Sequence, residues 1–428
     1  MKKVLIISYF FPPGNFAGSY RIKAWAEHLH KFGYYPIVVT RHWRDNETDY
    51  TAISEEKEIK KEEYGHYTVY RLPYKGSFRD RLVKRFGLKA IPWGRFFSFF
   101  QVIGQNYFLR SIPYRNIYYF SKQLLKENPD IKLVLTSGRP FIHFRFAYLL
   151  KKEFPYIEWV ADYRDPWNSC SNIKNSFKLK FLKMLETPLE KRWSKNAVFF
   201  TAVSEGLKKS VQEIVGHKVG YVVFNGFENF IECEERAENQ QELRISYVGS
   251  LYTQQRIEVF LEGFRDLVKN YPRSKIKLIF WGLGSEVKQK QRVRNFLNGF
   301  EDYYQINPWL EKKQLKKQLC RSDFFLIAGI PERKGTLTAK IFDYFSFRKP
   351  IILCPTDNDI LEEEIKRTKS GVILKNSEEV FKWLDETYKG WLKSGVIPFE
   401  GDIELIKEFT YEKQVKRLVS FLDQIYIS

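Results

Sequence analysis

Short apolar runs that end in Gly, Ser or Asp alternate with amphipathic stretches along most of the chain. This alternation is typical of βαβ units, in which helices cover both faces of a parallel sheet. One series of runs predicts strands at Val4–Ser8, Pro36–Thr40, Lys132–Thr136, Glu158–Ala161, Ala197–Ala202 and Tyr221–Phe224. A second series predicts strands at Arg244–Gly249, Lys275–Gly282, Phe324–Ala328, Pro350–Cys354 and Gly371–Leu374. The pattern therefore predicts two doubly wound α/β domains of similar size with a cleft between them.

The stretches Ser19–Phe32 and Phe141–Phe154 are examples of the helices expected between these strands. The two series are separated by the polar, acidic stretch Glu232–Glu242, which is the best linker candidate. The predicted organisation is an N-terminal domain over residues 1–230, a linker over 231–242 and a C-terminal domain over 243–402. The length of 428 residues agrees with two to three domains of roughly 150 residues each.

The chain is strongly basic, with 71 Lys and Arg against 51 Asp and Glu, a net charge of +20, and it is rich in aromatic residues. Such a charge favours nucleic acid, an anionic membrane face or phosphorylated small molecules as partners. No helix-turn-helix, zinc or RNP-like pattern stands out. We therefore expect no nucleic-acid partner and keep a basic nucleic-acid-binding protein as an alternative function.

The four cysteines, Cys170, Cys233, Cys320 and Cys354, lie far apart without a CxxC pair. This spacing predicts neither a zinc knuckle nor a disulfide framework, and it favours a reducing compartment. The apolar run Val4–Ile7 is too short for a signal peptide, and no window of about 20 apolar residues occurs. We expect a cytoplasmic protein that spans no membrane.

Ligands of open parallel sheets bind beyond the carboxyl ends of the strands, so the residues that follow each predicted strand are the candidate site residues. The candidates for ligand binding in the first domain are Gly14, Gly18, Ser137, Gly138 and Arg139. The two glycines belong to a loop that leads into a helix whose amides can face a phosphate or a sugar, or that simply needs small residues to turn. The histidine of the next helix, His143, is expected to be structural.

The densest polar cluster of the first domain is Asp162, Arg164 and Asp165, directly after the strand Glu158–Ala161. Charged groups are costly to bury alone, so these must pair with each other or meet a polar ligand. A structural Asp–Arg pair is the alternative to a catalytic role, which we favour.

In the second domain two cations are candidates for neutralising a phosphate, Arg256 after the first strand and Lys340 before the strand Pro350–Cys354. Their alternatives are a solvated surface Arg and an ordinary Lys340–Asp343 pair on a helix. The predicted nucleotide-binding residues of this domain are Gly249, Ser250, Gly282, Gly284, Thr336, Leu337, Thr338 and Asp343.

Six segments in this order make the chain resemble the retaining family 4 glycosyltransferases of the GT-B fold, most closely the bacterial members that build surface polysaccharides. The segments are the glycine loop near the start, Asp162–Trp167, Val203–Glu205, Asn225–Phe227, Gly249–Tyr252 and Leu337–Tyr344. The resemblance covers nearly the whole chain, and its strength lies in the combination of motifs.

The resemblance implies two facing Rossmann-like domains, with a nucleotide-sugar donor on the C-terminal domain and a glycan or lipid-linked acceptor on the N-terminal one. It also implies that the last helix, about Ile403–Tyr426 within 403–428, crosses back to the first domain. It implies transfer of a sugar to a hydroxyl with retention of configuration, and neither a cofactor nor a metal is expected. A nucleotide-sugar epimerase of the same two-domain fold is the alternative.

Position by position, Asp343 matches the second acid of the family's motif, which binds the ribose, whereas the place of the first acid is held by Gly335. The resemblance therefore passes the sugar contact to the backbone amides around Thr336–Ala339 or to another residue. Arg256 matches the family's phosphate-binding Arg loosely, and Lys340 replaces the Lys that usually follows it. Asp162, Arg164 or Asp165 occupies the place of a strand-end His. The segment Gln305–Leu310 matches the place where the backbone meets the base.

Within the stretch of about residues 75–115, the segment Lys75–Arg110 combines eight basic residues with one acid, Asp80, and many aromatic rings. Basic residues that alternate with rings suit an anionic lipid surface. The alternative is an insertion whose rings pack on its own domain. We favour peripheral docking on the inner face of the cytoplasmic membrane.

Overall fold

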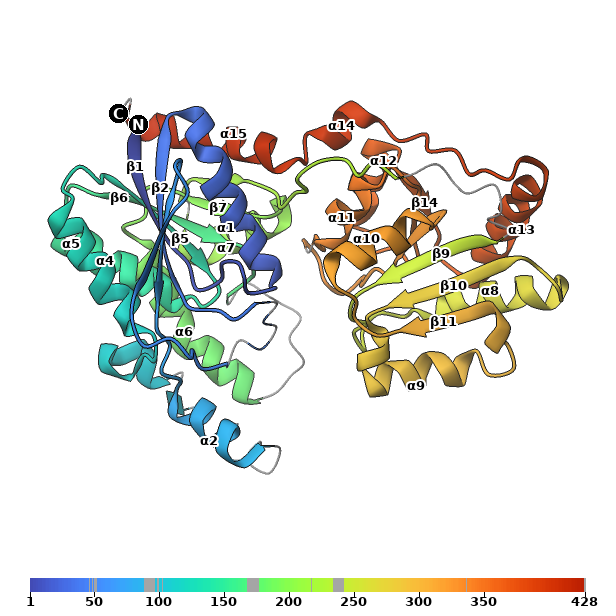
Figure 1. Ribbon diagram of the computed structural model, residues 1–428, viewed down its shortest axis with the longest axis horizontal. Coiled ribbons are helices and arrows are strands. Elements are labelled where there is room, and N and C mark those ends of the chain that lie inside the picture. Colours follow the sequence, from blue (N-terminus) through green and yellow to red (C-terminus); the bar gives the residue numbers. More distant parts are fainter. Residues whose placement is uncertain are drawn as a thin grey trace. The chain divides into compact units, whose positions relative to one another are not determined.

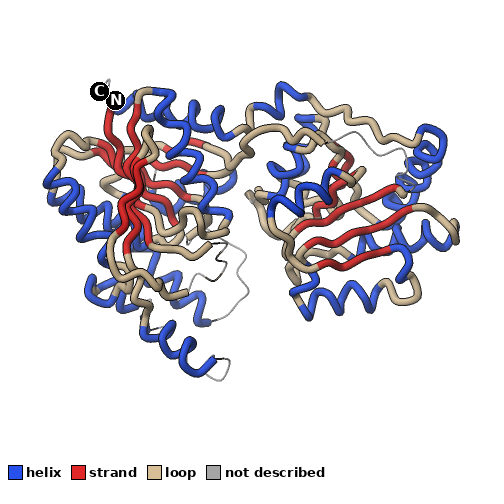
Figure 2. The backbone as a smooth tube through the Cα atoms, viewed as in Figure 1, coloured by secondary structure: helices blue, strands red, loops and turns tan. Residues whose placement is uncertain are grey.

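The computed structural model describes residues 1–45, 47, 49, 52–87, 97, 100–101, 103–167, 177–216, 218–233, 242–335 and 337–426. The chain divides into two compact units. Unit 1 contains Met1–Asn225 and Tyr411–Ser428, and unit 2 contains Gly226–Thr410. Each unit is built around its own sheet with helices packed against it (Figures 1 and 2). The chain therefore passes twice between the units.

The sheet of unit 1 has the strand order β3-β4-β2-β1-β5-β6-β7-β8. Its strands are β1 (Lys2–Ile7), β2 (Tyr34–Arg41), β3 (Lys60–Glu63), β4 (Thr68–Leu72), β5 (Leu133–Gly138), β6 (Glu158–Tyr163), β7 (Phe200–Ala202) and β8 (Gly220–Val222). Only the pair β3–β4 is antiparallel among these described strands. The helices are α1 (Ala17–His28), α2 (Phe78–Phe86), α4 (Arg115–Glu127), α5 (Ile142–Glu153), α6 (Phe177–Ser194), α7 (Glu205–Val215) and α15 (Tyr411–Leu422).

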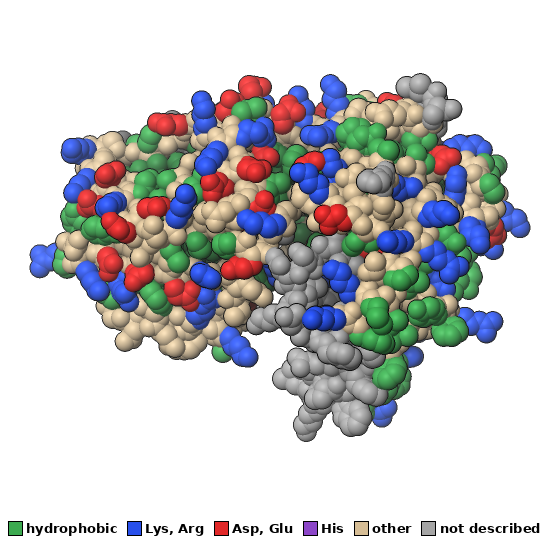
Figure 3. All heavy atoms as spheres, turned by 180° about the vertical axis from the view of Figure 1, so that it is seen from behind, with side chains coloured by type: hydrophobic (Ala, Val, Ile, Leu, Met, Phe, Trp, Pro, Cys, Tyr) green, Lys and Arg blue, Asp and Glu red, His purple; other side chains and the backbone are tan. Residues whose placement is uncertain are grey.

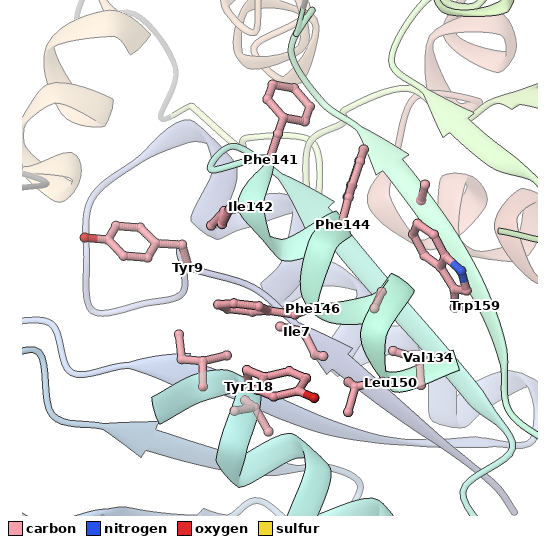
Figure 4. Packing of buried hydrophobic residues seen from close by; sticks show 14 of the residues in the cluster. Ile7, Tyr9, Tyr118, Val134, Phe141, Ile142, Phe144, Phe146, Leu150 and Trp159 are labelled. Atoms are coloured by element: carbon pink, nitrogen blue, oxygen red, sulfur yellow. The ribbon is translucent and has the colours of Figure 1, made fainter. Parts of the chain in front are cut away.

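Alternation along β1 shows how one strand supplies both layers of the core. Leu5 and Ile7 face the helix α5 side, where they join the aromatic cluster shown in Figure 4. Val4 and Ile6 point to the other face, where they pack with residues of α1 and α15. Because successive side chains of a strand point to opposite faces, a strand covered on both sides must be apolar throughout. The run Val4–Ile7 is apolar at every position because both faces of β1 are covered.

The sheet of unit 2 has the order β11-β10-β9-β12-β13-β14, and every described pair in it is parallel. Its strands are β9 (Leu243–Val248), β10 (Ile276–Trp281), β11 (Tyr304–Asn307), β12 (Phe324–Ile327), β13 (Ile351–Leu353) and β14 (Gly371–Ile373). Its helices are α8 (Glu258–Asn270), α9 (Val287–Phe296), α10 (Lys312–Cys320), α11 (Lys340–Ser346), α12 (Ile360–Thr368), α13 (Ser377–Ser394) and α14 (Ile403–Lys407).

The end of the chain differs from the sequence prediction. The single helix predicted over Ile403–Tyr426 is instead two helices, α14 in unit 2 and α15 in unit 1. Between them Thr410 forms an isolated β-bridge with Phe227, which fixes the chain in extended form at that point. An extended residue cannot continue a helix, so the helix must restart after it.

The prediction that the cysteines form no disulfide is wrong for one pair. Cys233 and Cys320 are bonded, with their Cα atoms 5.3 Å apart, although 87 residues separate them. Cys354 is buried and free, and Cys170 lies outside the described residues. Sequence spacing carries no information about a pair that only the fold brings together.

Candidate functional site

Each sheet has one point where the chain reverses its direction of winding. In unit 1, β1 leads to β2 on one side and β5 leads to β6 on the other, so the loops after β1 and β5 diverge. In unit 2 the loops after β9 and β12 diverge in the same way. Such switch points form crevices at the carboxyl ends of the strands, where doubly wound proteins bind their ligands. Many of the predicted site residues lie in these four loops or at the ends of the strands and helices that they join, whereas Asp162, Arg164 and Asp165 lie at the end of β6 and Gly282 and Gly284 follow β10.

In unit 2 the ammonium of Lys340 is drawn inward at the switch point. Its Nζ donates to the hydroxyl of Tyr247 over 2.8 Å and to the carbonyl oxygen of Ser250 over 3.1 Å. It also lies 4.0 Å from the centre of the Tyr247 ring. Burial lowers the pKa of Lys340 to about 7, because removing water penalises the charged form. The alternative pairing with Asp343 is not formed, since the Lys340 side chain turns to Tyr247 instead.

The two loops of this switch point are tied together. The Gln255 side chain donates to the carbonyl oxygen of Ala328 over 2.7 Å and accepts from the amide of Tyr252 over 2.9 Å. Gly249 has φ of +90°, and a Cβ there would lie 3.3 Å from the Lys340 Cε. Any larger residue at this position would be strained and would press on the lysine.

The indole of Trp309 lies beside this lysine, over the carboxyl ends of neighbouring strands. A Cβ on Gly282, after β10, would be 3.0 Å from the ring, and one on Gly249, after β9, would be 3.7 Å from it. The side chain is nevertheless 53% exposed. A large ring that rests on two glycines and leaves one face open provides a platform for stacking. Trp309 was not singled out from sequence, although the segment Gln305–Leu310 that contains it was.

The remaining predicted residues of unit 2 differ in their surroundings. Arg256 is exposed, with 70% of its side chain accessible, and it pairs loosely with Glu332 at 3.5 Å. No contact of the described residues joins it to Lys340. Asp343 is exposed in the first turn of α11. Leu337 is buried, and Ser250 and Thr338 are partly buried. A Cβ on Gly284 would lie within 3 Å of the backbone of Asn307 and Pro308. Thr336 lies outside the described residues.

A surface hollow of about 450 Å³ lies next to the same switch point. It is lined by Leu251–Gln254 of the loop after β9 and by Glu286–Gln289 at the start of α9. None of the predicted site residues lines it. The hollow extends the candidate site of unit 2 along its sheet edge.

In unit 1 the predicted cluster separates into a buried and an accessible part. The buried carboxylate of Asp162 accepts from Arg21 at 2.8 and 3.2 Å, and from the hydroxyls of Ser137 and Thr201, each at 2.8 Å. A structural Asp–Arg pair thus exists, but its arginine is Arg21 and not Arg164. Because every partner comes from a different element, Asp162 holds α1 to the ends of β5, β6 and β7.

The accessible part is Asp165, which pairs with Arg164, a side chain that is only 10% exposed, and the exposed Arg139 lies beside them. The Arg164 Nε lies 3.4 Å from the Asp165 Oδ2, and its Nη2 is 3.5 Å from the Arg139 carbonyl oxygen. Arg139 is exposed and Gly138 is buried. The Arg164 guanidinium lies against Gly18 of the first turn of α1, while Gly14 packs against Trp43.

His143, which was expected to be structural, is fully buried among Tyr9, Tyr114 and Phe146. Desolvation lowers its pKa to about 3, so the ring is neutral at physiological pH. A histidine so enclosed cannot exchange protons with a ligand at the surface.

The basic and aromatic segment is described in part. Residues 88–96, 98, 99 and 102 lie outside the described residues. Of the rest, Asp80 is buried and accepts from the hydroxyl of Tyr74 and the amide of Ser77. The exposed aromatic residues are Phe78, Phe86, Phe100, Tyr107 and Phe108, and the exposed basic residues of α2 are Arg81, Lys84 and Arg85. Figure 3 shows hydrophobic side chains beside Lys and Arg on this unit. Within the described part of the chain, no helix has the length and apolar character needed to cross a membrane.

Comparison with known proteins gives no match to any family model and none to a curated protein. Solved structures do match. Sucrose-phosphate synthase from Thermosynechococcus elongatus aligns over 100% of both chains with a TM-score of 0.65 and 13% identity. Anabaena HepE, in complex with UDP and glucose, aligns over 99% of this chain and 100% of its own with a TM-score of 0.61 and 10% identity. A glycosyltransferase from Rickettsia africae aligns over 99% and 98% with a TM-score of 0.59 and 14% identity.

These likenesses extend over the whole chain and both sheets. The predicted fold class is therefore confirmed: the chain has two doubly wound, Rossmann-like domains of the GT-B type.

Proposed function

We propose that this protein is a glycosyltransferase that moves a sugar from a nucleotide-diphosphate sugar to a hydroxyl group, with the nucleotide bound by unit 2. The observation that carries the proposal is the Lys340 ammonium, which is held at the switch point beside Gly249, against which the Trp309 ring also lies. The fold supports it, as does the presence of UDP and UDP-glucose in the HepE complexes.

The proposed chemistry follows from the charge of the leaving group. A nucleoside diphosphate departs as an anion, and fixed cations in a partly dehydrated site stabilise it more than water does. Lys340 has three N–H groups, of which Tyr247 and Ser250 take two, so the third can reach a phosphate oxygen. Trp309 would stack on the base and Asp343 would accept from the ribose hydroxyls. Arg256, which is exposed and, among the described residues, pairs only with Glu332 at 3.5 Å, is a second cation for the diphosphate.

A panel of nucleotides tests this assignment. UDP, GDP, ADP and CDP are added to the protein and to the Lys340→Met variant, and the melting temperature is recorded. A ligand at 100 times its Kd stabilises the native state by about 2.7 kcal/mol. We expect at least one diphosphate to stabilise the wild type and to lose most of its effect in the variant. If no nucleotide shifts the melting of the wild type, the proposal fails.

The reaction is then followed with the matching nucleotide sugar. Formation of a glycoside only when an acceptor is present supports transfer, whereas isomerised sugar in its absence would identify an epimerase. We further propose that configuration is retained and that no metal is needed, as the resemblance implies. The anomeric coupling in the NMR spectrum of the product and activity in EDTA measure these two points.

For the acceptor, we propose a glycan or lipid-linked glycan of surface polysaccharide synthesis, reached from a membrane surface. The support is α2, where Phe78 and Phe86 are exposed beside Arg81, Lys84 and Arg85. Each cation near an anionic bilayer contributes about 1 kcal/mol. Flotation with anionic vesicles at low salt should carry the protein upward. A Phe78→Ser, Phe86→Ser double variant should float less, and a wild type that never floats would exclude the docking.

A further inference from the structure

We propose that the hollow beside the switch point of unit 2 binds a neutral sugar through its hydroxyl groups, with the Glu286 carboxylate as the main acceptor. The hollow has a volume of about 450 Å³ and is lined by Leu251–Gln254 and Glu286–Gln289. Small-molecule sites in proteins measure about 300–1,000 Å³, so a sugar fits by size. The inference rests on the proposed function, because it names the class of group that is bound next to the diphosphate.

The hollow adjoins the ammonium that we assign to the diphosphate. The Lys340 Nζ donates to the carbonyl oxygen of Ser250 over 3.1 Å, and the next residue, Leu251, lines the hollow. From the other wall, Glu286 acts on the same lysine: burial lowers the pKa of Lys340, whereas the Glu286 carboxylate raises it. A ligand in the hollow would therefore lie beside a diphosphate held by Lys340.

Arg292 of α9 holds the two walls of the hollow in place. It donates to the carbonyl oxygens of Tyr252 at 3.4 Å and Gln255 at 2.7 Å. Its Nη1 also donates to the Oε1 of Gln289 over 3.2 Å, which directs the amide nitrogen of Gln289 towards the Thr253 hydroxyl at 3.5 Å. The hollow is thus shaped by hydrogen bonds within the protein, so little ordering is needed when a ligand binds.

The lining offers hydrogen-bond donors and acceptors but no net charge. Its carboxylate, Glu286, is partly buried, accepts no hydrogen bond from a described residue and forms no ion pair with one. Its ammonium is that of the exposed Lys288. The other polar side chains are neutral: Thr253, Gln254 and Gln289.

This set of groups selects the class of ligand. A sugar hydroxyl donates and accepts at the same time, so it can pair with a carboxylate and with an amide. An anionic ligand would be repelled by Glu286, and an apolar one would leave the polar groups without partners. A neutral, polyhydroxylated ligand meets neither penalty.

Tyr252 adds an apolar contact at the edge of the hollow. Its ring is 53% exposed, although the Arg333 guanidinium lies 5.9 Å from its centre. Small-molecule sites commonly combine such a ring with a few fixed polar groups. A sugar can place its C–H groups on the ring and its hydroxyls on Glu286 and Gln289.

Two sources could supply a sugar with this chemistry. One is the sugar of the donor, which is joined to the diphosphate at Lys340. The other is a sugar of the acceptor, which binds separately from the nucleotide. The two are distinguished by whether the sugar reaches the hollow as part of a nucleotide.

Calorimetry without an acceptor tests the donor source. UDP-glucose, UDP-N-acetylglucosamine and UDP-glucuronate are compared with UDP, GDP-mannose with GDP, and ADP-glucose with ADP. The variants are Glu286→Gln and Gln289→Leu, and the control is Glu386→Gln, which changes an exposed acid of α13. The measured quantity is the ratio of the nucleotide Kd to the Kd of its sugar, because an effect transmitted through Lys340 changes both constants and cancels.

We expect this ratio to fall about tenfold in Glu286→Gln, which loses a charged acceptor, and about fivefold in Gln289→Leu, which loses a neutral amide. The control should keep the wild-type ratio. UDP-glucuronate should bind the wild type more weakly than UDP-glucose, and Glu286→Gln should narrow that difference because the repulsion is removed.

Saturation-transfer NMR tests the acceptor source. The probes are the methyl glycosides of glucose, galactose, mannose and N-acetylglucosamine, added with the diphosphate that stabilises the protein. Transfer to a glycoside in the wild type and in Glu386→Gln that weakens in Glu286→Gln and Gln289→Leu would support the hollow as a sugar site. Together with unchanged Kd ratios, it would assign the sugar to the acceptor.

Kd ratios and glycoside signals that are both the same in the wild type and in the two hollow variants overturn this inference, while the nucleotide result of unit 2 stands. If no nucleotide binds at all, the proposed function fails. The methyl glycosides alone then decide whether the hollow binds a sugar, and an absence of transfer in the wild type would reject it.

Discussion

At the scale of single residues, Lys340 shows how burial can prepare a charge for a ligand. Its ammonium touches a tyrosine hydroxyl, a carbonyl oxygen and an aromatic ring, and none of these carries a full negative charge. Burial destabilises the protonated form in the free protein and lowers its pKa to about 7, although Glu286 acts in the opposite direction. A bound diphosphate would supply the missing counter-charge and raise the pKa again.

This coupling predicts a pH-dependent affinity for the nucleotide. The ligand binds the protonated lysine, so affinity should be constant below the free pKa of about 7. Above it, affinity should fall by up to about tenfold per pH unit until the pKa of the complex is reached. Calorimetry between pH 6.5 and 8.5 in two buffers should record proton uptake above pH 7. Lys340→Arg, which stays charged, should remove the slope, and a flat wild-type profile would contradict the assignment.

Trp309 leads to a second residue-level prediction. Stacking of a base on an aromatic ring contributes about 1–3 kcal/mol to binding. Trp309→Ala should therefore lower the affinity for a nucleoside diphosphate by about 5- to 150-fold. Pyrophosphate, which has no base, should bind both proteins alike, and Trp309→Phe should recover part of the affinity. An equal loss for pyrophosphate would show that the ring acts through Lys340 instead.

The sequence showed which residues are candidates for the site, but it did not show how buried they are or which residues they contact. Lys340 and Arg256 both stood out as cations near strand ends, but one is partly buried and the other exposed. The difference depends on Tyr247, which is 93 residues from Lys340 in the chain. Asp162 was recognised as a residue in need of a partner, and its partner Arg21 is 141 residues away. Local patterns cannot reveal such pairs.

At the scale of elements, the strands with an apolar run were predicted, including the edge strands β8 and β14, whereas β3, β4 and β11 were missed. Strands such as β1 and β9 are buried on both faces, so they read as apolar runs. The edge strand β3 has the sequence KKEE, and its neighbour β4 is interrupted by Arg71. Arg71 pairs with Glu62 of β3 at 2.9 Å, and hydrogen bonds from Lys60, Arg71 and Tyr64 lower the pKa of Glu62 to about 2 despite its partial burial. Strands held by ion pairs lack the apolar pattern.

Helix α15 should contribute to the stability of unit 1. Leu418 is fully buried on it, in the cluster that contains Val4 and Trp25. Replacing such a leucine by alanine leaves a cavity and costs about 2–5 kcal/mol. We expect Leu418→Ala to lower the urea midpoint of unit 1 markedly, whereas the exposed Lys416→Ala should change it little. Equal midpoints for the two variants would mean that α15 contributes little to the core.

At the scale of the whole molecule, the disulfide strengthens only one of the two units. Cys233 and Cys320 both belong to unit 2, and their bond closes a loop that contains β9, β10 and β11. In the chain-entropy description, a cross-link over about 90 residues stabilises a fold by up to about 4–5 kcal/mol. A reductant should therefore lower the melting of unit 2 and leave that of unit 1 unchanged. A Cys233→Ser, Cys320→Ser variant should not respond to it, and an unaffected wild type would contradict this prediction.

The division of the chain between the units also sets an order for its synthesis. Unit 2 is one continuous segment, Gly226–Thr410, so its residues have all been made before those of α15. Val4, Ile6 and Trp25 therefore lack their contacts with Val415 and Leu418 until the whole of unit 2 has been synthesised. The usual order of cotranslational folding, in which the earlier domain finishes first, is therefore reversed. The nascent polypeptide exposes an apolar face during this delay, and such a face is a surface to which chaperones of unfolded chains can bind.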